Sequence, residues 1–316
     1  MKTKNEYFRE FLNFFWLRPE NALLQALRAE KYAVMYAADL QIKKAKAIDV
    51  SCGDGVFTFV TFGGELAATT DMFRSIDLSK ERTAKFDTFD YYDESYQVTV
   101  SKEPFFKFHT GTDWKSNLLK KAAKLNFYGQ LLHHDNNLRL PLEDSSYDFT
   151  FSNSAYWVKN FEAHLQDLVR ITKPGGLIVL ELKMSDIIAD HMVINYAAHI
   201  MGTKFAKIID AGRIETWRGL RTRQEIDQIL RKLVGCRVVG MQPMYGGIIA
   251  RIWDIGLRPL FNPLAKMANN LNPEVRLSVK DEWCAIIREL CSELLDGYKA
   301  DEKDAIEWII TLEKTA

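Results

Sequence analysis

The sequence has little of several features that would assign it to a special class of protein. It contains only four cysteines and eight prolines in 316 residues, and its 42 lysines and arginines are balanced by 42 aspartates and glutamates. The cysteines form neither a CxxC pair nor a disulfide framework, which favours a reducing compartment such as the cytoplasm. The balanced charge gives no overall attraction to nucleic acid or to an anionic membrane, so we expect no nucleic-acid partner.

Long apolar runs are also missing. No uninterrupted run approaches the ~20 residues of a membrane-spanning helix. The N-terminal stretch interrupts its apolar residues with Arg9, Glu10, Asn13 and Arg18, so we expect no signal peptide. Hydrophobic residues nevertheless make up 47% of the chain, which is enough for a large buried core. We therefore expect a folded cytoplasmic protein.

The spacing of apolar residues predicts an α/β protein. Helical spacing between residues 5 and 36, broken at Arg18-Pro19, predicts two amphipathic helices. Strands and helices then alternate, which implies a Rossmann-like, doubly wound, mostly parallel sheet with helices on both faces. The predicted strands are 47–50, 73–78, 130–134, 147–153 and 177–182, and the predicted helices between them begin at 57, 113 and 161.

Two parts of the chain depart from this alternation. Residues 80–112 alternate polar with aromatic side chains across Ser101 to Pro104, which predicts a β-hairpin-like insertion. After residue 182 we expect helices at 185–201 and 222–234, a strand at 236–243 and a polar helix pair at the C-terminus. The predicted organisation is an N-terminal helical cap over 1–40, a core over 41–245 with the insertion at about 80–112, and a C-terminal helical extension over 246–316.

The stretch AIDVSCGDGVFTF points to a ligand. A strand ending near Asp49 leads into a turn with Gly53 and Gly55, where the missing side chains let the backbone approach a bound molecule. The third glycine of the dinucleotide fingerprint is absent, which disfavours a pyrophosphate. Asp77 ends the next predicted strand, where a carboxylate can accept hydrogen bonds from both hydroxyls of a ribose. The structural alternatives are an ordinary turn and a helix cap.

These segments, taken in order, resemble the class I S-adenosylmethionine-dependent methyltransferases of the small-molecule type. AIDVSCGDG resembles the first motif of that family and SIDLS the second. HHDNNLRLPLEDSSYDFTFSNSAYWV resembles its adenine-binding turn and fourth strand, and RITKPGGLIVLEL resembles the helix, glycine turn and fifth strand that follow. The resemblance covers roughly residues 47–182. It implies a methyltransferase that uses S-adenosylmethionine and releases S-adenosylhomocysteine.

The resemblance also assigns residues to the cofactor. Each would act at the carboxyl end of a strand, where ligands of open α/β sheets bind. The implied cofactor-binding residues are Asp49, Ser51, Gly53 and Gly55 in the loop, Asp77 and Leu78 at the ribose, Asp135 and Asn136 at the adenine, and Asn153 beside the methyl donor.

Methyl transfer needs few catalytic groups, because the sulfonium is already an activated methyl donor. Catalysis then consists mostly of positioning the acceptor against the methyl group. A general base is needed only where the acceptor must lose a proton. The candidates are His109, His133, His134 and Tyr156, although His133 and His134 point to opposite faces of a strand and each also has a purely structural interpretation. No cluster has metal-ligand spacing, so we expect no metal.

The acceptor is not named by any motif. Tyr156 and Trp157 follow the fourth strand and would line the acceptor pocket, while the aromatic residues of the insertion form either a lid or a stapled hairpin. Residues 246–270 mix apolar with basic side chains and would serve as a peripheral membrane contact, a lid or a dimer contact.

We therefore expect a small acceptor, apolar, lipid-like or sugar. The alternatives are a non-catalytic partner subunit that keeps the fold, a methyltransferase acting on protein or RNA, and, more weakly, a nicotinamide-dependent dehydrogenase. The oligomeric state is left open.

Overall fold

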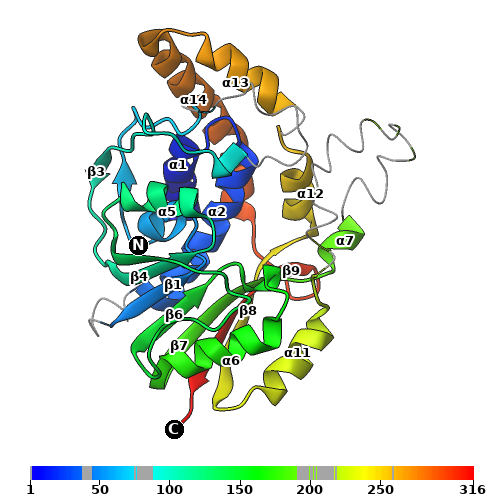
Figure 1. Cartoon of the computed structure of the whole chain (residues 1–316). Helices are drawn as coiled ribbons and strands as arrows, with labels where there is room; N and C mark the ends of the chain where they lie inside the picture. The colour runs from blue at the N-terminus through cyan, green and yellow to red at the C-terminus, as the bar shows by residue number, and fades with distance from the viewer. Residues whose placement is uncertain are drawn as a thin grey trace.

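The structure is a computed structural model of the chain, and it describes residues 2–37, 45–74, 76, 88–190, 199, 202, 204, 217, 219–257 and 260–316. Its centre is a seven-stranded sheet in the order β5-β4-β1-β6-β7-β9-β8 (Figure 1). The strands are β1 Ala47–Val50, β4 Phe108–Asp113, β5 Tyr128–His133, β6 Tyr147–Ser152, β7 Thr172–Lys183, β8 Cys236–Gly246 and β9 Ala305–Lys314. The first five pair in parallel and β9 runs antiparallel to both neighbours. The predicted Rossmann-like fold is confirmed.

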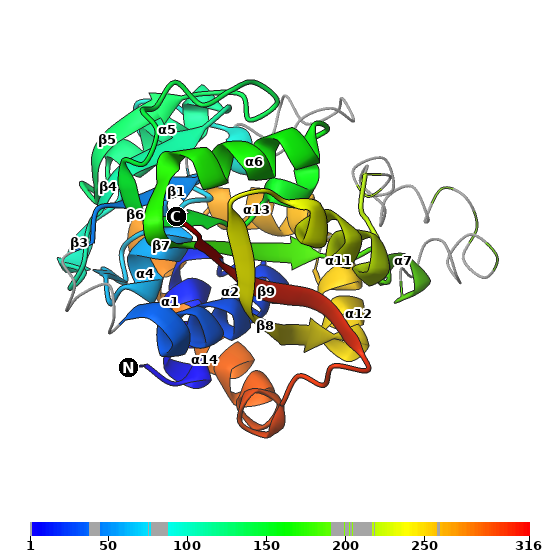
Figure 2. The ribbon, with the colours of Figure 1, turned by 90° about the horizontal axis from the view of Figure 1, so that it is seen from below.

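Each face of the sheet carries its own hydrophobic core. Because side chains alternate along a strand, Phe151 and Val179 face one side while Val50 and Leu180 face the other. Helices α1 (Lys4–Phe14) and α2 (Pro19–Tyr32) cover the first face, and α6 (Phe161–Ile171) and α11 (Arg223–Lys232) cover the second (Figure 2). The sheet is therefore the middle layer of three.

The predicted N-terminal helices are confirmed, and they pack directly on the sheet. A capping box joins Thr3 and Glu6 at the start of α1, and Pro19 occupies the first turn of α2, where its missing N–H costs nothing. Tyr32 at the end of α2 stacks on Phe151 of β6 with ring centroids 4.3 Å apart. The same face also carries the side chain of Asp49, so α2 lies over the strand that leads into the glycine turn.

Shorter elements complete the chain. Thr222 caps α11 through a second capping box with Glu225, at the predicted start of this helix. The other helices are α4 Val56–Thr61, α5 Ser116–Ala123, α7 Ile187–Asp190, α12 Gly247–Ile255, α13 Phe261–Asn269 and α14 Pro273–Gly297, with short helical turns η1 Ala33–Ala37, η3 Thr88–Asp90 and η4 Ala155–Trp157 and a separate strand pair, β2 Glu65–Leu66 and β3 Val100–Lys102. The predicted helix at 185–201 lies within the described residues only at its start.

The second strand of the sheet is not where the sequence predicts it. Residues 72–74 form a turn, while Asp77 and Leu78 lie outside the described residues. The strand beside β1 is β4, and it runs through Asp113, where a helix was predicted to begin. Helix α5 begins three residues later, and Gly129 belongs to β5.

The predicted hairpin insertion is also wrong in its pairing. Strand β3 pairs antiparallel with β2, which follows α4, and not with the segment after Pro104. That segment instead runs into β4 of the main sheet, where Phe105, Phe106 and Phe108 pack around Phe62 with ring centroids 5.3–5.8 Å apart. These aromatic side chains belong to the core between α4 and β4.

The C-terminal part differs as well. The expected helix pair is a single 25-residue helix, α14, and it is followed by strand β9. Strand β9 inserts between β7 and β8, so the last described residues belong to the central sheet. Residues 246–316 are therefore not a purely helical extension.

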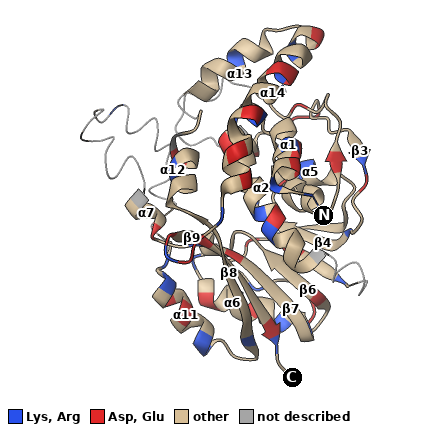
Figure 3. Ribbon diagram, turned by 180° about the vertical axis from the view of Figure 1, so that it is seen from behind, with Lys and Arg blue, Asp and Glu red and all other residues tan. Residues whose placement is uncertain are grey.

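Acidic and basic residues share the outer helices, as α11 and α14 show in Figure 3. Helices α12, α13 and α14 also expose apolar side chains, among them Ile248, Met267 and Leu290. Among the described residues, no helix is both long and apolar enough to cross a membrane. A peripheral membrane contact through residues 246–270 stays a prediction.

Candidate active site

The turn after β1 is built from residues with unusual backbone geometry. Ser51, Gly53 and Gly55 have φ values of 65°, 61° and 77°, in the left-handed region that glycine adopts without steric cost. Ser51 is held there by its side chain, because Asn136 donates a hydrogen bond to the Ser51 hydroxyl at 2.6 Å. The turn is thereby tied to the loop that follows β5.

The two glycines of the turn serve different purposes. A Cβ at Gly55 would lie 2.9 Å from the ring of Tyr128, so this glycine lets the turn pack against β5. A Cβ at Gly53 would meet nothing within 4 Å. Gly53 therefore presents its backbone to open space, as a ligand-binding turn requires.

Asp113 ends the strand beside β1 and reaches the turn. Its Oδ2 accepts a hydrogen bond from the Gly53 N–H at 3.0 Å, and its Oδ1 accepts one from the Lys115 N–H at 2.8 Å. Asp113 thus occupies the place that the sequence analysis gave to Asp77. The sequence analysis missed this strand because it placed the start of a helix at residue 113.

Three carboxyl groups surround the turn and are all disfavoured in their charged form. The pKa of Asp49 is raised to about 6. Burial and the nearby charge of Asp113 raise this pKa, whereas hydrogen bonds from Thr58 (2.5 Å) and Tyr128 (2.7 Å) lower it. Burial also raises the pKa values of Asp54 and Asp113. A positively charged ligand would stabilise these carboxylates, whereas a phosphate would be repelled.

Several buried polar atoms at this edge have no hydrogen-bond partner among the described residues. They are Asp49 Oδ1, Asn136 Oδ1 and Ser152 Oγ, at the ends of β1, β5 and β6. An unpaired buried polar atom costs ~1–3 kcal/mol, so such atoms call for a partner outside the protein. With the open side of Gly53, these atoms fit a polar cofactor with an adenosyl sulfonium group.

The predicted histidine candidates are spread apart. His109 is exposed in the first half of β4, towards the end of the sheet opposite the turn, which removes it as a base for this site. His133 and His134 lie at the carboxyl end of β5, where each ring meets a backbone carbonyl, that of Trp114 at 2.7 Å and that of Leu138 at 3.2 Å.

The residues predicted to contact the adenine and the acceptor follow the carboxyl ends of β5 and β6. Asp135 accepts hydrogen bonds from the backbone and side chain of Asn137, which hold its pKa below the usual range. Asn153 follows β6 and is half-buried, Tyr156 in η4 is half-buried, and the exposed fraction of Trp157 is 52%. Their contacts with cofactor and acceptor stay predictions.

A second buried polar cluster was missed by the sequence analysis. Arg28 of α2 donates two hydrogen bonds to Glu307 of β9 at 2.5 and 2.6 Å, and Tyr245 of β8 donates a third at 2.6 Å. Burial raises the pKa of Glu307, but Arg28 and Lys183 outweigh it and hold that pKa below its usual range. Glu181 of β7 lies beside this group. The only sequence signals were charged residues within otherwise apolar segments.

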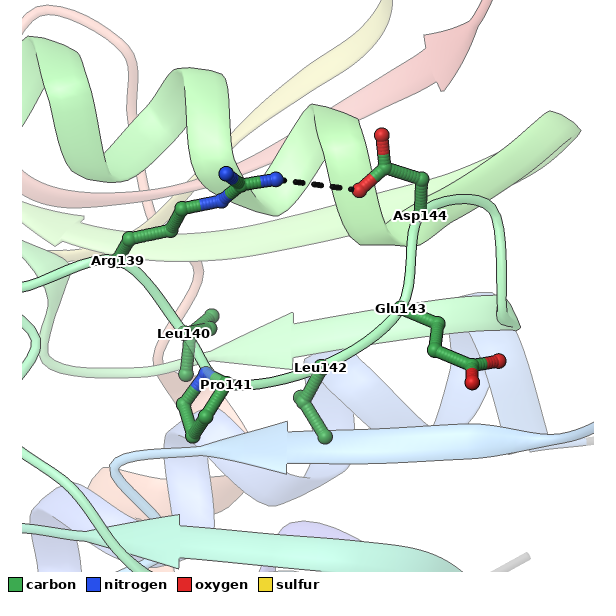
Figure 4. A pocket seen from close by; sticks show the side chains of 6 residues that line it. All are labelled: Arg139, Leu140, Pro141, Leu142, Glu143 and Asp144. Carbon is green, nitrogen blue, oxygen red and sulfur yellow. Dashed lines mark hydrogen bonds and ion pairs between the residues drawn. The ribbon is translucent and has the colours of Figure 1, made fainter.

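A shallow surface hollow lies elsewhere, along the loop between β5 and β6 (Figure 4). Arg139 and Asp144 face each other across it at 3.5 Å. The loop is fastened to α6, whose Asp167 accepts the Leu140 N–H and whose Arg170 carbonyl accepts the Ser145 N–H. The hollow is therefore separate from the glycine turn and lacks buried unpaired groups.

Comparisons with known proteins match part of this chain to methyltransferases. Residues 94–180 match the sequence profile of a family described as a methyltransferase domain. The chain is 30% identical over 152 residues to a demethylmenaquinone methyltransferase of Halalkalibacterium halodurans, covering 44% of this chain and 62% of that protein. It is 37% identical over 71 residues to a malonyl-[acyl-carrier protein] O-methyltransferase of Buchnera aphidicola, covering 22% and 28%. The chain thus spans less than two thirds of the curated relatives it matches.

The fold also resembles a solved structure described as a sarcosine dimethylglycine methyltransferase from Galdieria sulphuraria. The superposition covers 92% of this chain and 86% of that chain, with 13% sequence identity and a TM-score of 0.47. That likeness is too distant to carry a functional argument. The profile match over residues 94–180 and the sheet order support a methyltransferase domain with a Rossmann-like fold in this chain.

Proposed function

We propose that the protein binds S-adenosylmethionine at the turn after β1 and transfers its methyl group to a small organic acceptor. The observation that carries the proposal is the group of three carboxyls around an open glycine turn, of which Asp49 and Asp113 are buried and Asp54 is half-buried. This environment suits the sulfonium and ammonium charges of that molecule and opposes the phosphates of a dinucleotide.

Each residue then has a definite task. Asp113, at the end of β4, would accept hydrogen bonds from the ribose hydroxyls while its contact with Gly53 keeps the turn in register. Asp49 would face the cationic methionine part, and Asp135 and Asn136 the adenine. The bound cofactor supplies an activated methyl group, so the protein's own contribution is to orient the acceptor and to exclude water.

The proposed acceptor is small, and apolar, lipid-like or sugar. The names of the two curated relatives support this size class, since one acts on a malonyl group carried by a protein and the other on demethylmenaquinone. The balanced charge of the chain, with 42 basic and 42 acidic residues, gives no support to a nucleic-acid substrate.

Calorimetric titration with S-adenosylmethionine and S-adenosylhomocysteine tests the proposal. We expect micromolar binding of both, and a loss of ten- to a hundredfold in Asp113→Asn, because hydrogen bonds to a charged group contribute ~1.5–3 kcal/mol. The exposed Asp144→Asn serves as the matched control and should bind within about twofold of the wild type, and Asp77→Asn tests the ribose contact predicted for Asp77. A loss in Asp77→Asn alone would return the ribose to Asp77, and no binding to the wild type would reject the proposed function.

A further inference from the structure

Glu181 lies near the carboxyl end of β7, and no described residue donates a hydrogen bond to its carboxyl group. Glu181 is 0% exposed, and neither of its carboxyl oxygens accepts a hydrogen bond from a described residue. The nearest cation is Arg28, whose Nε lies 4.0 Å from Glu181 Oε2 and is already bonded to Glu307. A buried carboxyl without donors is costly, and such groups concentrate at functional sites.

Glu181 belongs to the same side of the sheet as the proposed cofactor site. Asp49 is level with Phe151, which is level with Val179, and Glu181 stands two residues further along the same face. The hydroxyl of Tyr32, from α2, is also buried without a partner, and its pKa is raised by burial and by the charges of Asp49 and Glu181. Asp49, Glu181 and Tyr32 each carry an unpaired buried oxygen and interact electrostatically with one another.

The other charged groups around Glu181 are bound to each other. Arg28 and Tyr245 are hydrogen-bonded to Glu307, and Lys183 lies 4.0 Å from the same carboxylate. Tyr156 adjoins this group, with Lys183 Nζ 5.7 Å from its ring centroid, and is half-buried three residues after Asn153. Asn153 is the residue predicted to lie beside the methyl donor.

We propose that Glu181 binds the N–H or O–H group of the methyl acceptor and takes its proton during transfer. This rests on the proposed function. As the acceptor's nitrogen or oxygen bonds to the methyl carbon, the bond between that carbon and sulfur breaks, the sulfur keeps the electron pair and becomes a neutral thioether, and the proton passes to a Glu181 carboxylate oxygen. The acceptor is therefore an amine or a hydroxyl compound, and not a carboxylate, which has no proton to lose.

The protonation state of Glu181 supplies a specific signature. Burial raises its pKa to about 8, with Glu307 and Asp49 adding to the effect and Arg28 opposing it. Only the deprotonated form can accept a proton, so the rate of transfer should rise with pH through about 8. Asp49, with a pKa of about 6, is deprotonated before this range is reached.

The test compares wild type, Glu181→Gln and a control, Glu162→Gln, which changes an exposed residue of α6. Release of S-adenosylhomocysteine is measured from pH 6 to 9.5 with benzylamine, phenol and benzoate as acceptors, and S-adenosylmethionine affinity is measured by calorimetry. We expect turnover with benzylamine or phenol, a fall of ~100-fold or more in Glu181→Gln, and loss of the rise near pH 8. The affinity for S-adenosylmethionine and all Glu162→Gln values should stay within about twofold.

The outcomes separate this inference from the function on which it rests. Failure of the wild type to bind S-adenosylmethionine rejects the proposed function and the inference together. Binding without turnover of benzylamine or phenol, turnover of benzoate alone, or an unchanged rate and pH profile in Glu181→Gln each overturn only the role of Glu181. If Glu181→Gln does not fold, Glu181→Met replaces it and is judged by the same readouts.

Discussion

The two halves of the sheet's carboxyl edge treat their acidic residues differently. At β1 and β4, Asp113 has a backbone N–H on each of its oxygens, and the glycine turn is held by these bonds. At β7 and β9, Glu307 is paired with Arg28 while Glu181 has no donor. The first half is organised by the backbone, so its glycine turn is visible in the sequence. The second is organised by side chains from segments far apart in the sequence.

The largest expected effect comes from breaking the buried pair. Arg28→Met should lower the free energy of unfolding by about 3–5 kcal/mol, because it removes the two hydrogen bonds and the closest positive charge from the buried carboxylate of Glu307. Arg237→Met is the matched control: Arg237 pairs with Glu313 at 3.0 Å at a more exposed position, and its loss should cost about 0–1 kcal/mol. Urea unfolding of both variants checks the difference, and equal losses would contradict it.

Gly53 and Gly55, in the turn after β1, can be compared with each other. Gly55→Ala should destabilise the protein by about 2–4 kcal/mol, since it combines left-handed strain with contact against Tyr128. Gly53→Ala carries only the strain, about 1–2 kcal/mol, but its methyl group enters the open space and should weaken S-adenosylmethionine binding by tenfold or more. Thermal unfolding and calorimetry measure the two effects, and a Gly53→Ala protein with full affinity would place the cofactor elsewhere.

Removing the unsatisfied carboxyl should stabilise the protein. Glu181→Met is expected to raise the free energy of unfolding by about 1–3 kcal/mol at pH 8, since it replaces a buried charge without donors by an apolar side chain. The same substitution should abolish methyl transfer while leaving S-adenosylmethionine bound. A destabilised variant would show that Glu181 has a structural partner.

The stability of the wild type should also depend on pH through Glu181. Its pKa rises from 4.5 to about 8 on folding, so its contribution is fully present below pH 4.5 and is lost as pH rises through about 8. The pKa of Asp49 rises to about 6 on folding, so its contribution to stability is lost at lower pH than that of Glu181. The pKa of His164 falls to about 4 on burial, so its contribution to stability increases as pH rises from about 4 to 6.5. Urea unfolding between pH 6.5 and 8.5 should therefore show a decline in the wild type that Glu181→Met lacks.

The smallest effect concerns the strained serine. Ser51→Gly relieves a left-handed backbone costing about 1–2 kcal/mol but loses the hydrogen bond from Asn136, worth about 0.5–1.5 kcal/mol. The two terms nearly cancel, so the free energy of unfolding should change by less than about 1 kcal/mol. A change above 2 kcal/mol in either direction would mean that one of these terms is absent.

The parts of the fold that the sequence predicted are those encoded locally. The turn from Asp49 to Gly55 and the capping box at Thr222 are short patterns whose geometry depends on adjacent residues, and both are confirmed as structural elements. The sheet class followed from strands and helices alternating at regular spacing. These signals need no knowledge of distant contacts.

The secondary-structure predictions were wrong where pairing with distant strands determines whether a segment is a helix or a strand. The run ending in Asp113 has the composition of a helix start as well as of a strand end, and only its pairing with β1 selects the strand. Strand β9 has no turn signal joining it to a partner, because its partners β7 and β8 lie far away in the sequence. Glu181 was visible in LIVLEL, but its lack of partners is a property of the folded chain.

The position of β9 orders the assembly of the molecule. Strands β5, β4, β1, β6 and β7 all precede residue 184, so their parallel pairing can form as soon as that part of the chain has been synthesised. Among the strands that the structure describes, β8 pairs only with β9, and must wait about sixty residues for it. During that interval the ribosome carries a sheet whose β7 edge is bare, so nascent-chain aggregation or chaperone recruitment should begin when β7 emerges and cease when β9 docks.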